Sequence, residues 1–256
     1  MSVKNRQGMG VAVTAGLAMV AASAVNAAVV AQCERTGVAA DGQGLVTAWD
    51  SLGGGTAFAP LFASSPVWTL PALEPGGVAF DAGDGLPASP LASGLAAVST
   101  LFLVVDPAPA GDRFAALVEA PGASVTVAPH AEPPTYDPED AAGLSVCVNG
   151  ADSPGFPAAR HIVEVDFPQP VTGGALRVGG ASACAGWDQV WRGRVLTVIA
   201  FDEPPGEPVR KVVRSMLARF HGIPGNFPPP GREAVLQAVW QGLNTHGLFA
   251  TVMILK

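Results

Sequence analysis

Charged residues are scarce in this sequence, and positive charge is the scarcest. Of the 256 residues, 14 are Lys or Arg and 21 are Asp or Glu, so the net charge is −7 with the four His neutral. A surface that binds nucleic acid needs clustered Lys and Arg to neutralise phosphates. We therefore expect no RNA or DNA partner.

Cysteine is also rare, and its three positions lie far apart. Cys33, Cys147 and Cys184 form no Cys-x-x-Cys pair and no short Cys/His spacing, so the sequence contains no zinc-site pattern. Two interpretations stay open for the later two. Cys147 and Cys184 form a disulfide in an oxidising compartment, or all three cysteines are buried free thiols.

Motifs of common enzyme chemistry are missing. The sequence has no P-loop, no dinucleotide-binding fingerprint and no G-x-S-x-G nucleophile elbow. Its four histidines stand in no short metal-binding or nucleophile pattern: His130, His161, His221 and His246. Apart from a Ca²⁺ ion, considered below, no cofactor is expected.

Residues 38–170 lack the helical periodicity that parallel α/β folds need for crossover connections. They hold short apolar runs divided by Gly, Pro and Asp, which predicts an all-β, antiparallel two-sheet sandwich. We expect residues 99–106 to form a central strand and the proline-rich residues 129–139 to form a loop. The runs are residues 45–49, 56–62, 66–70, 77–80, 100–105, 114–120, 124–128, 144–148 and 161–167.

Residues 1–32 differ from the rest of the chain. Lys4 and Arg6 precede an uncharged stretch, residues 8–32, and Val25-Asn26-Ala27 supplies small residues where a secretory signal is cleaved. This pattern predicts a signal peptide, a mature start near Ala28, and a secreted or cell-surface protein. Retention of residues 8–32 as a membrane anchor, or as a hydrophobic arm in an assembly, stays open.

A buried strand and an amphipathic helix follow one another near the end of the chain. Residues 194–201 are rich in β-branched and large apolar side chains, which favours a strand. From Val209 to Phe220 the apolar residues fall on one helical stripe, with Arg210 and Arg214 expected to face elsewhere. Gly222 ends this helix. We expect it to cover the sandwich as a lid.

Residues 224–256 form a predicted C-terminal extension. It begins with the stiff linker 224–231, continues with a helix over residues 232–243, and ends with a possible strand, residues 248–255. We expect the extension to pack on its own domain or to contact another subunit.

Several segments together resemble bacterial laminin G-like domains of the concanavalin A-like lectin/glucanase fold. The family's motifs are similar to TAWDSLGGG (47–55), GVAFDAGDGL (77–86), LRVGG (176–180) and the strand and helix that end in FHGI (220–223). The resemblance covers residues 38–223 and implies a jelly-roll sandwich over residues 33–223, with a helix after the last core strand.

The resemblance also raises the question of glycoside hydrolysis. Glucanases of this fold carry an E-x-D-x-x-E pattern, and this chain has Glu164, Asp166 and Gln169. Retaining hydrolysis needs two carboxyl groups, and Gln169 cannot serve as an acid. We expect a protein that is not an enzyme, with Glu164 and Asp166 on an exposed face of a strand; a glycoside hydrolase is the minor alternative.

Two further groups are candidate binding residues. Asp81 and Asp84 flank a tight turn and could hold Ca²⁺, although two carboxylates are few for that ion and ordinary turn residues are the alternative. A polar segment rich in tryptophan could stack on sugar rings, or its tryptophans could close the sandwich core. Its residues are Trp187, Asp188, Gln189, Trp191 and Arg192.

Three functions follow from these observations. The first is a non-catalytic recognition or adhesion module that binds glycan or protein on a surface or outside the cell. The second is a structural subunit of a virion, fibre or surface layer, as a homo-oligomer or with assembly neighbours, whose termini dock on those neighbours. The third is the glycoside hydrolase. Fold alone does not decide among them.

Overall fold

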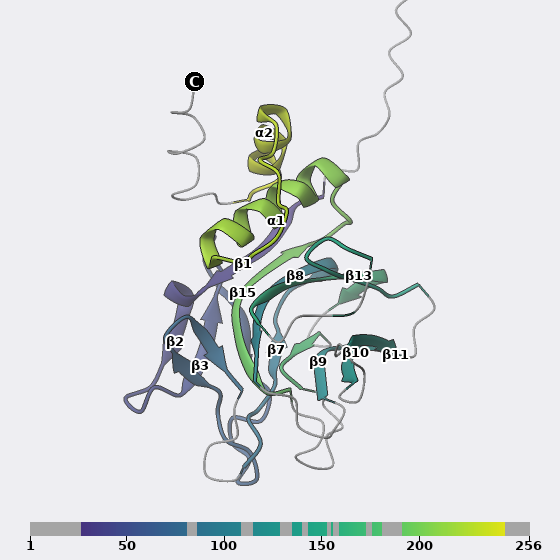
Figure 1. Cartoon of the computed structure of the whole chain (residues 1–256). Helices are drawn as coiled ribbons and strands as arrows, with labels where there is room; N and C mark the ends of the chain where they lie inside the picture. Colours follow the sequence, from purple (N-terminus) through teal and green to yellow (C-terminus); the bar gives the residue numbers. More distant parts are fainter. Residues whose placement is uncertain are drawn as a thin grey trace, which may run out of the picture.

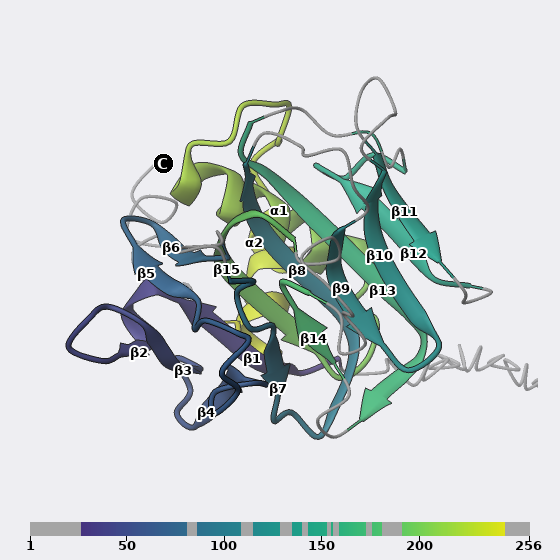
Figure 2. The same ribbon diagram turned by 90° about the horizontal axis from the view of Figure 1, so that it is seen from below.

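The computed structural model (Figure 1) describes residues 27–80, 86–108, 115–128, 135–139, 143–152, 155, 159–172, 176–180 and 191–243. Two antiparallel sheets face each other (Figure 2), which confirms the predicted all-β sandwich. The first sheet has the order β12-β13-β8-β15-β6-β5, with β1 also paired to β15, and the second has the order β11-β10-β9-β14-β7-β4-β3-β2.

The strands of the first sheet are β1 (Val29–Glu34), β5 (Ala72–Glu74), β6 (Gly77–Ala79), β8 (Ala97–Pro107), β12 (Ser145–Val148), β13 (His161–Thr172) and β15 (Gly193–Phe201). Those of the second are β2 (Val38–Ala40), β3 (Val46–Asp50), β4 (Thr56–Pro60), β7 (Leu91–Ser93), β9 (Ala115–Ala120), β10 (Ala123–Ala128), β11 (Thr135–Glu139) and β14 (Arg177–Val178). The helical elements are η1 (Arg35–Gly37), α1 (Glu207–His221) and α2 (Arg232–Trp240).

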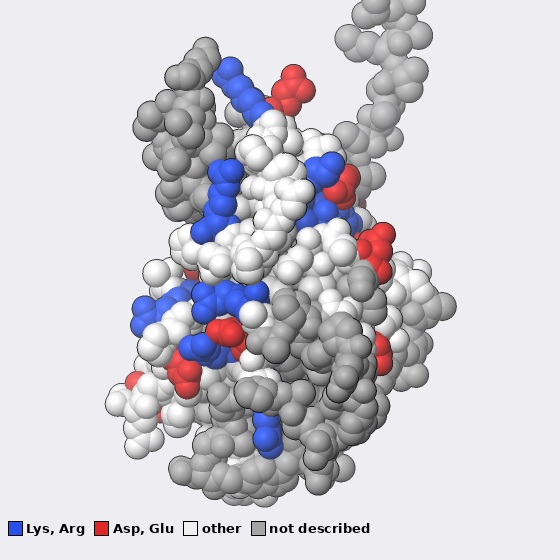
Figure 3. All heavy atoms as spheres, viewed as in Figure 1, with Lys and Arg blue, Asp and Glu red and all other residues white. Residues whose placement is uncertain are grey.

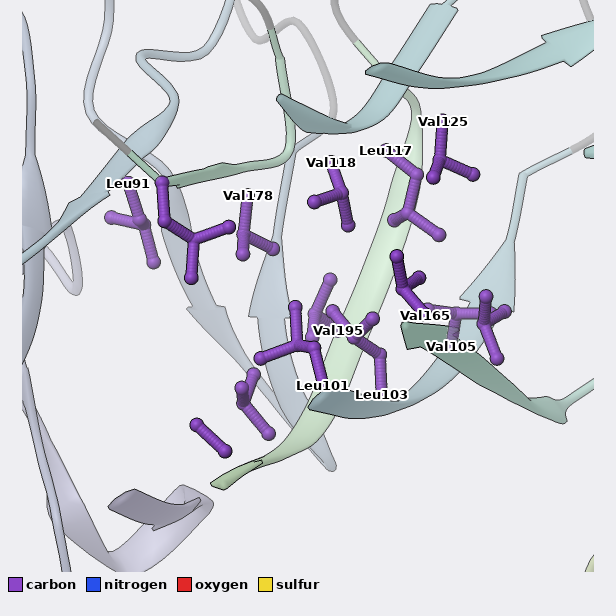
Figure 4. Packing of buried hydrophobic residues seen from close by; sticks show 14 of the residues in the cluster. Leu91, Leu101, Leu103, Val105, Leu117, Val118, Val125, Val165, Val178 and Val195 are labelled. Carbon is purple, nitrogen blue, oxygen red and sulfur yellow. The ribbon is translucent and has the colours of Figure 1, made fainter. Parts of the chain in front are cut away.

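Strand β8 shows why the first sheet has a core on each face. Successive side chains of a strand point to opposite faces. Leu101 and Leu103 accordingly lie in the core between the sheets, whereas Phe102 and Val104 lie in a second core under the helices. Figure 4 shows the first core, with side chains from both sheets pointing toward one another: Leu91, Leu101, Leu103, Val105, Leu117, Val118, Val125, Val165, Val178 and Val195.

Helix α1 packs on the outer face of the first sheet (Figure 1), which confirms the predicted lid. Val209, Val213 and Leu217 are buried against the sheet. Phe220, on the same predicted stripe, is 60% exposed. The prediction that Phe220 is buried was wrong. Periodicity gives the direction in which a side chain points from the helix, but not how far the sheet beneath the helix extends.

Two predicted segments have a different structure. Residues 66–70 form no strand but part of a turn-rich loop. Residues 135–139, expected to be a loop, form β11 at the edge of the second sheet. Pro138 is tolerated there because an edge strand leaves one side without a partner, and a missing N–H on that side breaks no ladder hydrogen bond.

The first sheet is also more continuous than the sequence predicts. Strand β13 runs past Pro168, with a register shift between Asp166 and Val171. Strand β1 pairs with β15 from Val29 onward, so the sandwich begins before residue 33. Within the described residues, no helix is long and apolar enough to cross a bilayer.

Substitution of Gly179 with alanine is expected to destabilise the fold by about 2–4 kcal/mol, from left-handed strain and overpacking together. Gly179 has a φ of +84°, and an added Cβ would lie 2.1 Å from a ring carbon of buried Phe80. Gly122 is the matched control, because its φ is +67° and no atom lies within 4 Å of its added Cβ. Urea unfolding measures both variants; equal losses would contradict the packing argument.

Candidate functional site

Of the predicted tryptophan-rich site, Trp191 lies in the core. Trp191 is 2% exposed, and its indole lies edge-on to Phe80 with ring centroids 6.1 Å apart. Its neighbour Arg192 is exposed. Trp191 therefore closes one end of the core, and its burial does not fit stacking on a ligand. The other predicted members lie outside the described residues: Trp187, Asp188 and Gln189.

The predicted metal and disulfide residues are only partly described. Asp81, Asp84 and Cys184 lie outside the described residues. Cys147 is a free thiol whose Sγ lies 3.2 Å from Oδ1 of Asp152. Burial, together with that hydrogen bond, raises the pKa of Cys147 to about 12. Within the described residues, no three His, Cys, Asp or Glu side chains are grouped to hold a metal ion.

Glu164 and Asp166 project from the same face of β13, as the strand period predicts, but that face is not exposed. Glu164 is 1% exposed because α1 lies over it. Arg210 of α1 donates to the carboxylates of both residues, with 2.8 Å between its Nη1 and Oδ2 of Asp166. Arg214 donates from Nε to Oε2 of Glu164 at 2.8 Å. The expectation of an exposed charged strand face was therefore wrong.

These contacts give both carboxylates a structural role. Thr100 donates its hydroxyl to Oδ1 of Asp166 at 2.6 Å, and Arg210 Nη2 donates to the same oxygen at 2.9 Å. The guanidinium groups of Arg210 and Arg214 thus join the helix to the sheet by ion pairs that are 12–13% exposed on the arginine side. Hydrolysis of a glycosidic bond would require carboxyl groups open to the sugar, and Glu164 lies beneath α1.

Charge elsewhere on this face is mixed. Figure 3 shows positively and negatively charged side chains lying near one another over the first sheet and α1. Arg194 Nη2, for example, lies 2.6 Å from Oδ2 of Asp106, and Arg160 Nη2 lies 3.2 Å from the same oxygen.

The loop between β4 and β5, residues 61–71, carries a stacked aromatic pair that the sequence reasoning missed. The rings of Phe62 and Trp68 have centroids 4.6 Å apart and an interplanar angle of 24°. Both side chains are partly exposed, and Val67 between them is 60% exposed. Leu86, in the segment that leads to β7, is a further large apolar residue that is partly in solvent, at 37% exposed. The pair presents an apolar, aromatic surface to solvent.

Hydrogen bonds to a neighbouring buried segment fix the loop that carries this pair. The amide of Phe62 donates to Oγ of Ser89 at 2.9 Å, and Ser89 is fully buried. The amide of Thr69 donates to the carbonyl of Pro87 at 2.9 Å, and the amide of Ser89 donates back to the carbonyl of Thr69 at 2.8 Å. Both ends of the turn that bears Trp68 are therefore anchored, and the aromatic pair is preorganised.

Strand register places this loop at the end of the sandwich where Trp191 closes the core. Pro60, the last residue of β4, pairs with Leu91, and Leu91 pairs with Val178 near the end of β14. Just beyond, Gly179 lies against Phe80, which also packs on Trp191. The Phe62–Trp68 pair therefore lies at the same end of the sandwich as Gly179 and Trp191.

A signal for the aromatic pair was present in the sequence. Trp68 follows the turn formers Ser64-Ser65-Pro66, a combination more typical of an ordered loop than of a strand.

The two-sheet architecture itself is shared by many sandwiches and does not single out laminin G-like domains. Comparison with protein-family models, with curated proteins and with solved structures finds no match to this chain.

Proposed function

We propose that this chain is a non-catalytic recognition module of laminin G-like fold that binds glycan or protein outside the cell or on its surface. The observation that carries the proposal is the preorganised Phe62–Trp68 pair at one end of the sandwich. Loops held on a rigid scaffold are where binding residues concentrate. The burial of Glu164 under α1 supports binding over hydrolysis.

The chemistry of the pair suits a sugar ring. The C–H face of a pyranose stacks on an aromatic face while nearby polar groups take the hydroxyl hydrogen bonds. Ser64, Ser65 and Thr69 are close to Trp68 in the sequence, and a hydroxyl group can both donate and accept a hydrogen bond. The same surface suits an aromatic or aliphatic anchor of a protein partner.

Export is part of the proposal. The tripartite pattern in residues 1–32 predicts a signal that is removed near Ala28. Strand β1 begins at Val29, so this cleavage would keep every strand of the first sheet.

Replacement of Trp68 with alanine is expected to reduce glycan or protein binding at least tenfold, since loss of a central aromatic anchor costs about 2 kcal/mol or more and tenfold corresponds to about 1.4 kcal/mol. A glycan array, followed by titration against the best ligand, measures the effect. Trp240 in α2 is the matched control because it is 89% exposed and lies on another element. Binding that survives Trp68→Ala but is lost in Trp240→Ala would contradict the assignment of the site.

A structural subunit is the second candidate, and the exposed face of α2 favours it. Leu236, Val239 and Trp240 are 48%, 44% and 89% exposed, respectively. Val235 and Ala238 of the same helix are buried and tie it to the fold. Trp240→Ala also separates the two candidates when the mass of the protein in solution is measured. An assembly subunit would self-associate as wild type and lose this association in the variant. A recognition module would have the same mass in both forms.

A further inference from the structure

Ala28, the residue before β1, is held by the side chain of Asp202. The amide of Ala28 donates to Oδ1 of Asp202 at 2.6 Å, and the amide of Asp202 donates to the carbonyl of Ala28 at 3.1 Å. The next amide, that of Val29, donates to the carbonyl of Gln241 after α2 at 2.7 Å. The end of β15, the end of α2 and the start of β1 therefore meet at Ala28.

The acceptor for the Ala28 amide is a carboxylate, which carries a full negative charge. Within β1, by comparison, Ala31 pairs with Ala200 of β15, and the amide of Gln32 donates to the neutral hydroxyl of Ser51. Its hydrogen bond to a neutral amide is already charge-assisted, and a cationic donor at the same place would add the attraction between two opposite full charges. The Asp202 carboxylate is thus suited to a positive charge at the nitrogen of Ala28.

We propose that export removes residues 1–27 and that Asp202 then binds the new α-ammonium group of Ala28. This inference rests on the proposed export. An endopeptidase that removes export signals would add water across the Ala27–Ala28 bond. The hydroxyl goes to the carbonyl carbon of Ala27, which leaves as a carboxylate, and the Ala28 nitrogen gains the hydrogen. The released proton then converts that amine to an ammonium.

The burial of Ala27 sets the order of events. Ala27 is 1% exposed, so its peptide bond to Ala28 is not accessible in the folded chain. Cleavage accordingly precedes the pairing of β1 with β15. The charge then forms before the strand docks, and Asp202 positions the new terminus at the end of the sheet.

The test compares the chain purified after export with the full chain made by cell-free translation without membranes. Intact mass and N-terminal sequencing are expected to show a start at Ala28 in the exported chain. Asp202→Asn is expected to lower the folding equilibrium constant about tenfold more in the exported chain than in the full chain, because only the exported chain loses an ion pair. Glu203→Gln, an exposed neighbouring carboxylate, is the control and should affect both chains equally.

Different failures identify different errors. A retained Met1 would overturn both the proposed export and this inference, and a start at any residue other than Ala28 would overturn the inference. A start at Ala28 with equal effects of Asp202→Asn in the two chains would overturn only the role of Asp202. If the variant does not fold, NMR titration of the ¹⁵N-alanine-labelled wild type decides. The pKa of the Ala28 α-amino group should lie above its usual range of about 7.7–8.0, and a value within or below that range would reject the ion pair.

Discussion

Replacing Arg210 with methionine is expected to lower the free energy of unfolding by about 3–5 kcal/mol, the range for removal of one partner of a buried ion pair. Arg210 contacts Glu164 and Asp166 together, and Glu164 is 1% exposed. Methionine preserves the apolar part of the side chain but leaves buried negative charge with one fewer positive partner. Urea denaturation at neutral pH measures the loss.

Lys211→Met is the matched control for this prediction. Lys211 is the next residue of α1 and is exposed, so its loss of charge should change stability by less than about 0.5 kcal/mol. Similar small losses in both variants would mean that the ion pairs between α1 and β13 contribute nothing beyond an ordinary surface charge. That outcome would also reopen the question of whether Glu164 is free for other chemistry.

Acidification from pH 6.5 to pH 4 is expected to destabilise the protein by about 3 kcal/mol through His161 alone, since each pKa unit corresponds to 1.36 kcal/mol. Burial lowers the pKa of His161 to about 4, from an ordinary value of 6.5. The unfolded chain therefore gains a proton across this interval that the folded chain does not. The stabilising contribution is complete above pH 6.5 and declines as pH falls toward 4.

Burial is what favours the neutral ring of His161 in the folded protein, and its hydrogen bonds fix which ring nitrogen carries the hydrogen. Nδ1 lies 2.6 Å from the carbonyl of Ala159, which can only accept, so Nδ1 carries the hydrogen. Nε2 is then the acceptor for the hydroxyl of Tyr136 at 2.8 Å. His221, whose pKa burial also lowers to about 4, adds to the same trend.

Measurement of urea unfolding at several pH values for wild type and His161→Gln checks this prediction. The variant should be less stable at pH 7 but should lose less stability between pH 6.5 and pH 4. A wild type and variant with parallel pH profiles would show that His161 does not carry the acid sensitivity.

The regular elements could be predicted because their signals are local. Residues 99–106 alternate between two apolar environments, and the structure places β8 between β13 and β15 in the first sheet. The stripe through Val209, Val213 and Leu217 likewise predicted a helix and the face that it buries. In both cases the period of the side chains alone carries the information.

The long-range contacts could not be predicted in this way. Arg210 and Asp166 are 44 residues apart in the sequence, and nothing local indicates that their charges meet. The first residue of β1 could not be predicted for a different reason. Val29 has the same apolar character as the residues before it, so no change in composition marks the start of the strand.

The candidate site shows the same division between local and long-range information. Trp191 was predicted as a binding residue and Trp68 as part of a strand, yet Trp191 is 2% exposed and Trp68 lies in a loop and is partly exposed. Which tryptophan faces solvent depends on which strands end nearby, and the sequence does not give the strand order. In the structure Trp191 packs against Phe80 in the core, whereas Trp68 stacks on Phe62 in a loop.

The most direct test of a non-catalytic recognition module is to incubate the exported protein with a broad glycan panel and to recover the retained sugars for mass analysis. The account predicts that retained glycans return with unchanged mass and that retention falls at least tenfold in Trp68→Ala. Shortened sugars that disappear when Glu164 is replaced with glutamine would contradict it, because they would show that the carboxylate beneath α1 performs hydrolysis.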